Sequence, residues 1–474
     1  MLRDLALILC TAFVLFLLRL EGRGARGVSP ALWIPTVWML ATASKPLAIW
    51  FGVVGNNEGG SGLDQLLLTT LGIAGLVVLI RRRFNWQRAL HRHGWLLALL
   101  CFMLISTIWS DITLIALRRW MRQVIVLIMA LVIMSETNPY QALESVLRRF
   151  AYVYIPFSLV VIKYFPAFGV SYSWSGVQMW TGIALHKNGF GSMCTISALF
   201  FLWAYLQRRE RATAVRHQSW ADISVLLIAL FLLTGAQKNS ATALTTLGVG
   251  IVTLLGLRLL RNVNFVVLKA VSLALVIFLI AFGVAAPFLG GSNVASFSSQ
   301  LGRDDTLTGR TDVWAAVLPA MEQQPMLGYG FGSFWTDARR QFYEISDAHN
   351  GYLDILLELG AVGLTFYFGW LLSCARKFQD VLARNYNWAS LAICYLVMAL
   401  VFNVTESTLS GLVDQITVVV VLVSLVVPHV CSGQSDGVQG LTGTLMESNK
   451  ECSSGASVYL LNPDEKSRVR SLLP

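Results

Sequence analysis

Apolar stretches long enough to cross a lipid bilayer recur along this chain from its first residues to about Pro428. A membrane-spanning helix needs roughly 20 mostly apolar residues, and a helix satisfies its own backbone hydrogen bonds where no water is present. Hydrophobic residues make up 55% of the chain and charged residues 13%, against about 45–50% and 25% in soluble domains. The sequence therefore predicts an all-α polytopic membrane protein and excludes a soluble enzyme.

Thirteen stretches qualify as candidate spans, so we expect about 12–13 transmembrane helices. They lie near residues 5–18, 31–50, 63–80, 95–110, 119–135, 151–168, 189–206, 220–236, 240–257, 265–287, 352–373, 388–404 and 411–428. The predicted organisation is a first helical region at 1–288, a large loop at 289–350, a second helical region at 351–429 and a polar tail at 430–474. We interpret the tail as flexible, because it is rich in Gly, Ser and charges.

Lysine and arginine cluster in alternate loops, and cytoplasmic loops carry the excess of these residues. The loops near 81–83, 208–216 and 376–377 share one side, which we take as cytoplasmic. The N-terminus and the large loop then lie outside and the tail lies inside. Apolar runs separate the basic clusters, so the net charge of +10 does not indicate a nucleic-acid partner.

Some basic residues break this rule, and ionisable groups at the edge of a bilayer usually face a cavity, pair, or serve a function. The exceptions among the 36 Lys and Arg residues are Arg3, Lys45, Arg118, Arg119, Arg122, Lys163, Lys187, Lys238, Arg303, Arg310, Arg339 and Arg340. As a group they suggest an anion-binding vestibule at the outer surface. For any one of them, snorkelling of the side chain to lipid headgroups remains an alternative.

The large loop at 289–350 is too long and too aromatic for a plain connection, so we expect it to fold onto the membrane surface. Its middle predicts a helix, with Thr311 as N-cap and Asp312 in the first turn, running toward Gln324. Pro325 is expected to end that helix.

A glycine-rich turn, LGYGFGSFW, follows this helix. Its glycines at 328, 330 and 332 permit tight turns whose backbone N–H groups could face an anion. A plain aromatic-rich turn is the favoured alternative, since spaced glycines alone are weak evidence. The turn is no Walker motif, because no GK[ST] follows it.

Two histidines, His186 and His349, lie outside by this topology, and each immediately precedes a span. A neutral imidazole there can accept a proton near physiological pH. The competing interpretation is a histidine that only hydrogen-bonds the backbone at the interface. Two histidines without a carboxylate cluster make a poor metal site, so no metal or other cofactor is expected.

The loop segment LGRDDTLTGRTDVWAAVLPAMEQQPMLGYGFGSFW, followed by AHNGYLDILLELGAVGL, resembles the bacterial O-antigen ligase and polymerase superfamily, and its exopolysaccharide polymerase branch most closely. The resemblance extends over about residues 30–425. Supporting segments are LWIPTVWMLATASKPLAIW at 32–50, SDITLIALRRWMRQ at 110–123, TGIALHKNGFG at 181–191 and LLTGAQKNSATAL at 232–244.

The resemblance implies a C-type membrane glycosyltransferase fold in the bacterial inner membrane, with the active site facing the periplasm. It implies metal-independent transfer of a glycan from undecaprenyl diphosphate to a sugar hydroxyl, with His349 as general base. The diphosphate-binding residues would be Arg310 and Lys238, joined by Arg118, Arg119, Arg122 and Lys187 from the vestibule. The other substrate contacts would be His186, Arg303, Asp312, Trp335 and Asn350.

The implied partners are the lipid-linked oligosaccharide, its acceptor, membrane lipids and other polysaccharide assembly proteins. Three functions stay open. The first is a polymerase that joins lipid-linked repeat units, and the second is a ligase that moves the finished glycan to lipid A-core. The third is a transporter whose outer cations bind an anionic substrate without chemistry. The sequence shows no internal repeat of the kind found in transporters, so the transporter ranks below the two enzymes.

Overall fold

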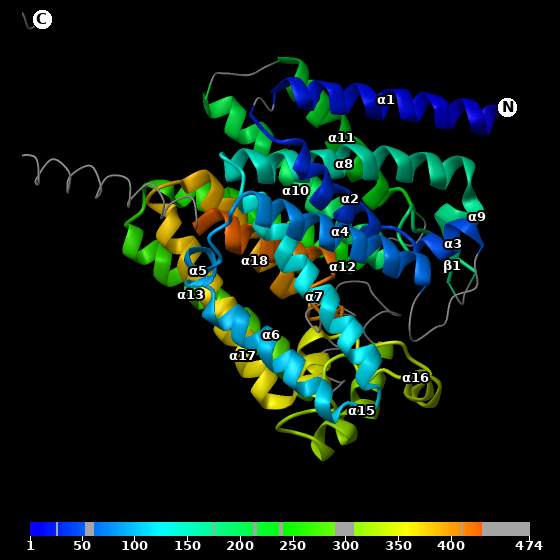
Figure 1. The fold of residues 1–474 in the computed structure, drawn as a ribbon, viewed down its shortest axis with the longest axis vertical. Coiled ribbons are helices and arrows are strands. Elements are labelled where there is room, and N and C mark those ends of the chain that lie inside the picture. Colours follow the sequence, from blue (N-terminus) through cyan, green and yellow to red (C-terminus); the bar gives the residue numbers. More distant parts are fainter. Residues whose placement is uncertain are drawn as a thin grey trace, which may run out of the picture. The chain divides into compact units, whose positions relative to one another are not determined.

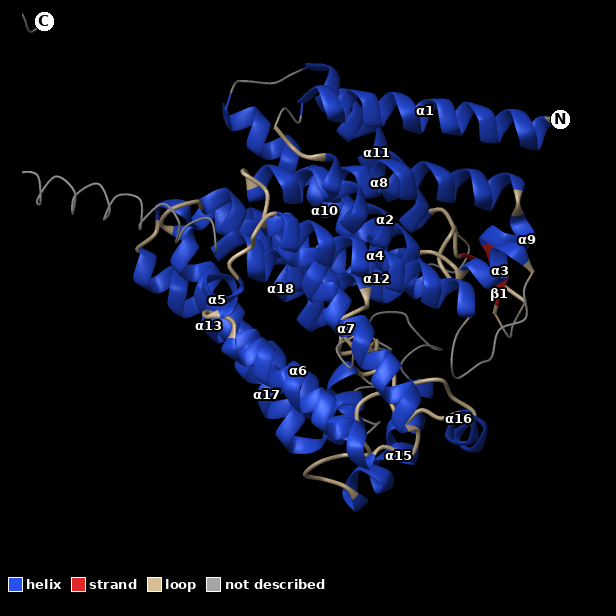
Figure 2. Cartoon of the chain, in the orientation of Figure 1, coloured by secondary structure: helices blue, strands red, loops and turns tan. Residues whose placement is uncertain are grey.

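The computed structural model describes residues 1–24, 27–52, 61–173, 176–211, 216–236, 240–289, 308–408 and 411–428. These residues are helical apart from turns and one small sheet (Figures 1 and 2). The α-helices are α1 (Leu2–Gly24), α2 (Trp33–Ala43), α3 (Leu47–Phe51), α4 (Gly62–Arg81), α5 (Trp86–Leu90), α6 (Gly94–Ser106), α7 (Thr113–Met134), α8 (Pro139–Tyr164), α9 (Pro166–Gly169), α10 (Lys187–Arg211), α11 (Arg216–Thr234), α12 (Ala241–Leu259), α13 (Phe265–Ala285), α15 (Thr308–Gln323), α16 (Asp337–Tyr343), α17 (Gly351–Leu382) and α18 (Tyr386–Phe402). Short 3-10 helices cover Pro30–Leu32, Thr107–Trp109, Leu260–Asn262 and Ala286–Phe288.

Seven of the described helices are long and apolar enough to cross a membrane: α1, α4, α8, α10, α12, α13 and α17. Shorter apolar helices cover Pro30–Ala43, Gly94–Trp109, Gln218–Thr234, Tyr386–Phe402 and Gln415–Pro428. The protein is therefore a helical, multi-pass membrane protein, as the apolar runs predict. The predicted span at 119–135 lies on α7, whose arginines at 118, 119 and 122 set it apart from the apolar helices.

The predicted span at 31–50 is broken into α2 and α3. The break falls at Ser44–Lys45–Pro46, because a proline disfavours the helical conformation in the residue before it. Lys45 is buried at the break and donates from its backbone N to the Ile183 carbonyl at 2.7 Å. The break thus holds the segment that leads into α10.

Helix α17 is interrupted at Gly360, whose φ of 63° and ψ of −167° are not helical. A Cβ at this position would lie 2.3 Å from the carbonyl carbon of Met326, so glycine is required there. The freed amides of Ala361 and Val362 donate to the carbonyls of Pro325 and Met326 at 2.9 and 3.2 Å. After the break the helix continues to Leu382, so 376–377 lie in a helix and not in the predicted loop.

One two-stranded antiparallel sheet departs from the all-α expectation (Figure 2). Strand β1 (Val170–Tyr172) pairs with β2 (Gln178–Trp180), with Val170 opposite Trp180. The two strands include Val170, Tyr172 and Trp180, and β-branched and aromatic residues favour strands. The sheet lies between α9 and α10 in the sequence.

The described part of the large loop is folded, as predicted. Helix α15 begins at Thr308, three residues before the predicted N-cap Thr311, and ends at Gln323. It packs with residues of the glycine-rich turn and the start of α17 in a small core. Its buried members are Ala286, Trp314, Val317, Ala320, Phe334, Trp335, Ala348, Leu353 and Leu357.

Candidate functional site

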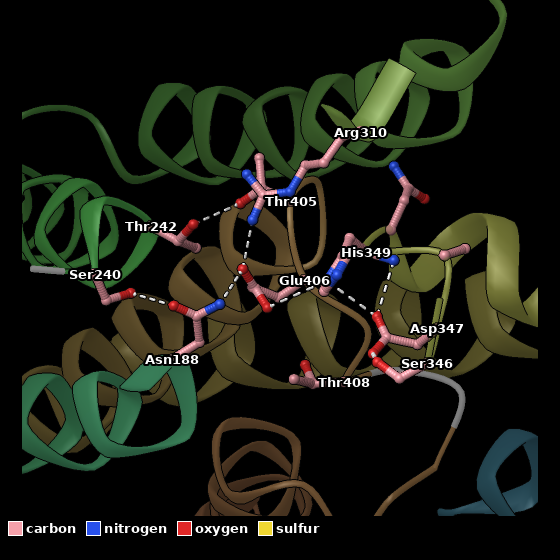
Figure 3. A network of polar contacts seen from close by, with 12 residues as sticks. Asn188, Ser240, Thr242, Arg310, Ser346, Asp347, His349, Thr405, Glu406 and Thr408 are labelled. Carbon is pink, nitrogen blue, oxygen red and sulfur yellow. Dashed lines mark hydrogen bonds and ion pairs between the residues drawn. The ribbon is translucent and has the colours of Figure 1, made fainter. Parts of the chain in front are cut away.

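Two polar side chains from separate helices, Arg310 and Asn188, contact Glu406 in the segment that follows α18 (Figure 3). Arg310 of α15 places Nη2 2.6 Å from Glu406 Oε1, and Asn188 of α10 donates to the same oxygen at 2.7 Å. Ser240, the N-cap of α12, donates to Asn188 Oδ1 at 2.9 Å. The carboxylate therefore joins the starts of three helices.

His349 lies beside this cluster, immediately before the N-cap of α17 (Figure 3). Its Nδ1 is 3.1 Å from Asp347 Oδ1 and 3.9 Å from Glu406 Oε2. Neither contact has hydrogen-bonding geometry, so Nδ1 is buried without a hydrogen-bond partner among the described residues. The backbone of His349 has a φ of 47°. A residue with a side chain pays a conformational penalty there, and such strain is often found at functional sites.

Trp314 explains why Arg310 and His349 meet. Its indole Nε1 donates to the carbonyl of Ala348 at 2.9 Å, directly before His349. Arg310 is four residues before Trp314 in α15, so both side chains leave the same face of that helix. One helix face therefore fixes the histidine segment and delivers the guanidinium beside it.

The buried carboxylate of Asp354 also holds the backbone segment just before His349. Asp354 Oδ1 accepts from Trp335 Nε1 at 2.8 Å and from the backbone N of Ala348 at 3.3 Å. Asn350 caps α17 through the amides of Tyr352 and Leu353. Its side chain also donates to the carbonyls of Gly283 and Val404, at 3.3 and 3.1 Å.

Trp335 and Asn350, two of the predicted substrate contacts, are buried in this structure. Their polar side-chain atoms bind the protein itself. Both side chains hold the backbone segment that carries His349.

The pKa values of the two candidate histidines are shifted in opposite directions. The pKa of His349 is raised, first by the Glu406 carboxylate and then by Asp347, against the opposing effects of burial and Arg310. The pKa of His186 is lowered, first by burial, although Asp347 and Glu406 also act on it and raise it. His186 therefore stays neutral to lower pH than His349.

The glycine-rich turn is not an anion-binding nest. Its amides at Tyr329 and Gly330 donate to the carbonyls of Leu357 and Glu358, at 2.9 and 2.8 Å. Phe331 N donates to Ser106 Oγ, and Gly332 N donates to Glu358 Oε2, both at 3.0 Å. These amides are used within the protein, which confirms the favoured interpretation of a plain aromatic-rich turn.

The remaining predicted cations are dispersed. Arg119 donates to the carbonyl of Gly332, and Arg118 is exposed on α7. Arg122 lies one turn further along the same helix. Lys187 lines a small pocket with Trp180 and Ser240, next to the Asn188 contact.

Lys45 and Asp312 also have defined places. The Nζ of Lys45 donates to the carbonyls of Gly182 and Ala184. Asp312 is exposed on α15. Lys238 and Arg303 lie outside the described residues.

Glu406, Asp347 and Asn188 were not predicted as site residues. A signal existed for Glu406, since NVTES is a polar segment between the last two apolar stretches, on the same side as His349. Asp347 and Asn188 each lie within two residues of a histidine that was singled out. Among the described residues, no group of three or more His, Cys, Asp or Glu side chains is arranged to hold a metal ion.

Comparison with known proteins connects this geometry to a family. Residues 223–368 match the family model described as O-antigen ligase. The chain is also 26% identical over 307 residues to the exopolysaccharide production protein ExoQ of Rhizobium meliloti (strain 1021), a match that covers 60% of this chain and 67% of the relative. The chain therefore carries an O-antigen ligase family region at residues 223–368, and that region contains both Arg310 and His349.

Proposed function

We propose that this protein is a glycosyltransferase that polymerises undecaprenyl-diphosphate-linked repeat units into an exopolysaccharide or an O-antigen-like glycan. The family match and the relative named for exopolysaccharide production support this class of reaction. The observation that carries the proposal is the meeting of Arg310 and His349 around Glu406, because the reaction needs a cation and a base at one point.

The chemistry assigns each side chain a task. The diphosphate is a good leaving group, so the enzyme must hold it and offset the charge that develops as it leaves. Fixed cations do this, and we assign the task to Arg310 and Lys238, with Lys187 at the adjoining pocket. His349 removes the proton from the acceptor hydroxyl. That hydroxyl attacks the anomeric carbon opposite the leaving diphosphate, so the configuration inverts.

Further substrate contacts are proposed for the other residues that the sequence singles out. His186 interacts electrostatically with Asp347 and Glu406, which supports a contact to the acceptor sugar. Asp312 and Arg303 belong to the same loop and are assigned to the glycan. Arg118, Arg119 and Arg122 are assigned to the headgroup region of the lipid substrate, since all three lie in the first half of α7.

We also propose the finer topology that the reaction requires. Thirteen spans would place the N-terminus and residues 289–350 in the periplasm and residues 430–474 in the cytoplasm, in a C-type glycosyltransferase-like fold of the inner membrane. The helices at the predicted stretches and the loops rich in Lys and Arg support this arrangement.

A ligase is the second candidate, because the matched family is described as O-antigen ligase. The two functions share the donor and differ in the acceptor. The test mixes purified protein with a lipid-diphosphate-linked repeat unit, with and without lipid A-core. A ladder of longer lipid-linked chains supports the polymerase, and transfer that requires the core supports the ligase. If neither mixture gains a glycosidic bond, both proposals are wrong.

A further inference from the structure

The Glu406 carboxylate lies between two groups that could each pair with it, Arg310 and His349 (Figure 3). Its side chain is only 9% exposed, and Oε1 accepts from both Arg310 and Asn188. Oε2 points toward His349, 3.9 Å from Nδ1. The backbone around it is fixed: Asn403 Oδ1 accepts from Thr408 N and Oγ1, and Gly351 N donates to the Asn403 carbonyl.

The first need is that of Arg310, whose guanidinium is already paired in this structure. A carboxylate at 2.6 Å forms a charge-assisted hydrogen bond, which is among the stronger polar contacts in proteins. An anionic donor that binds Arg310 must therefore compete with Glu406. A diphosphate carries more negative charge than a carboxylate, so it can win that competition when it is placed at the guanidinium.

The second need is that of His349, whose Nδ1 is buried and has no hydrogen-bond partner among the described residues. When a histidine acts as a base through Nε2, a carboxylate at Nδ1 fixes the tautomer and stabilises the imidazolium that forms. Asp347 is nearer, but its Oδ1 already accepts from the backbone N of His349 at 2.9 Å. Glu406 Oε2, 3.9 Å from Nδ1, belongs to the second carboxylate beside the ring.

We propose that Glu406 is a positioning residue that exchanges partners during the reaction. Without donor, its carboxylate neutralises Arg310; when the donor diphosphate takes Arg310, the carboxylate closes onto Nδ1 of His349. Asn188 keeps its contact to Oε1 during this movement and acts as the pivot. The inference rests on the proposed function, because it requires an anionic donor and a histidine base.

The step transfers one proton to the histidine and exchanges one bond at the anomeric carbon. The acceptor O–H bond breaks and its proton moves to Nε2 of His349. The acceptor oxygen forms the new bond to the anomeric carbon, while the bond from that carbon to the diphosphate oxygen breaks and the diphosphate leaves with the electron pair. Glu406 at Nδ1 balances the positive imidazolium. Donor binding thus prepares the base that the donor requires.

The charged and titratable groups that face His349 come from four segments of the chain. They are Asp347 in its own segment, Arg310 of α15, His186 before α10, and Glu406 after α18. Among these groups, the Glu406 carboxylate pairs with Arg310 through Oε1 and lies 3.9 Å from His349 Nδ1 through Oε2. Exchange is therefore a property of Glu406 and not of Asp347.

The test compares Glu406→Gln with Glu322→Gln, an exposed acid on α15. Removing the competing charge should tighten binding of undecaprenyl diphosphate, which has no sugar and cannot react. We expect a gain of about three- to tenfold in affinity, since binding no longer displaces a partner. In the same variant kcat for chain extension should fall by about tenfold or more, because Nδ1 has lost its carboxylate. Glu322→Gln should change neither value.

A pH profile separates exchange from a structural role. Glu406 is the first cause of the raised pKa of His349, so Glu406→Gln should move the acid limb of the kcat profile to lower pH. Asp347→Asn serves as the matched comparison. If Asp347→Asn moves the limb of kcat and Glu406→Gln does not, Asp347 is the partner and our inference is wrong.

Two outcomes overturn the inference while the proposed function stands: an active wild-type enzyme whose Glu406→Gln variant binds undecaprenyl diphosphate no tighter, or one that loses affinity and kcat together. If Glu406→Gln does not fold, Glu406→Asp replaces it. The shorter carboxylate should weaken the Arg310 contact and again tighten donor binding while kcat falls. If the wild type extends no chain, the proposed function fails, whereas the binding measurement still reports on the competition at Arg310.

Discussion

Two charged clusters lie toward opposite ends of α10, and they use the same residue types differently. The Arg310 cluster contains Arg310, Glu406, His349, Asp347 and Asn188. The Arg148 cluster contains Arg148, Arg208, Asp222, Glu144 and Tyr152. Asn188 and Arg208 are 20 residues apart on α10, which is about 30 Å at 1.5 Å per residue.

The Arg148 cluster is closed. Arg148 and Asp222 are 4% and 1% exposed. Both oxygens of Asp222 are occupied: Oδ1 accepts from Tyr152 and from Arg148 Nε, and Oδ2 accepts from Arg148 Nη2 and Arg208 Nη2. Glu144 adds a contact to Arg148 at 2.7 Å. The cluster thus joins α8, α10 and α11 through an aspartate whose two oxygens are both used, although Arg208 Nη1 is buried without a hydrogen-bond partner among the described residues.

The Arg310 cluster is open by comparison. His349 is 34% exposed, its Nδ1 lacks a hydrogen bond within the described part of the chain, and one carboxylate serves Arg310 and Asn188 together. Arg208 Nη1 in the other cluster also lacks a partner, so the partial exposure of His349 beside its carboxylates is what favours a binding site here. A cluster of charged residues therefore does not by itself indicate a functional site. Its exposure and the hydrogen-bond partners of its side chains must be considered as well.

The largest effect is expected for His349→Ala. Loss of a general base should lower kcat by about 10²- to 10⁴-fold, while the protein should still fold because His349 Nδ1 has no hydrogen-bond partner among the described residues. The measurement is the rate of appearance of longer lipid-linked chains, with thermal unfolding as a control. Near wild-type turnover in this variant would show that the Arg310 cluster, like the Arg148 cluster, does not supply the catalytic base.

Asp222→Asn should act on stability instead. Removing the charge leaves the buried Arg148 and the partly exposed Arg208 without their shared anion, and breaking a buried ion pair costs about 3–5 kcal/mol of unfolding free energy. Denaturation in detergent measures this loss, and turnover per folded molecule should stay at the wild-type value. A stable Asp222→Asn protein with lowered kcat would make the closed cluster catalytic and contradict our comparison.

Arg310→Lys keeps the positive charge and removes the planar fork that grips phosphate. Losing a hydrogen bond to a charged group costs about 1.5–3 kcal/mol, so kcat/KM for the donor should fall by about 10- to 100-fold. Steady-state kinetics at varied donor concentration test this. An unchanged kcat/KM would return Arg310 to a purely structural pairing with Glu406.

Trp314→Phe should have a smaller effect on the same site. The ring stays in the core while the hydrogen bond to the Ala348 carbonyl is lost. A neutral hydrogen bond contributes about 1 kcal/mol, so we expect about a fivefold lower kcat. Trp335→Phe, which removes the indole contact to Asp354, provides the neighbouring comparison.

The pH profile offers the subtlest distinction, because it identifies the histidine that acts as base. A base must be unprotonated, so activity falls as pH drops through its pKa. The pKa of His349 is raised from 6.5, first by Glu406, and the pKa of His186 is lowered from 6.5, first by burial. An acid limb of kcat/KM above pH 6.5 assigns the base to His349, whereas a limb below pH 6.5 would assign it to His186.

Local patterns predicted much of this molecule. The apolar runs marked the stretches that are helical, and the TGRTDVW and AHNGYL segments singled out Arg310 and His349. Other features depend on contacts far along the chain. The amides of the glycine-rich turn are consumed by Ser106 and by α17, and the Gly360 break exists because the backbone at Met326 approaches it.

The sequence by itself determined that this is a membrane protein with a folded loop between helices, because hydrophobicity and helix spacing act over a few turns of chain. It did not place Arg310 and Trp314 on one helix face, because Thr311 was the predicted N-cap and the helix in the structure begins at Thr308. The tertiary structure alone decided that Glu406 would stand between Arg310 and His349, 96 residues beyond the arginine. A contact of that span is chosen by how the helices pack, and no local pattern of charge encodes it.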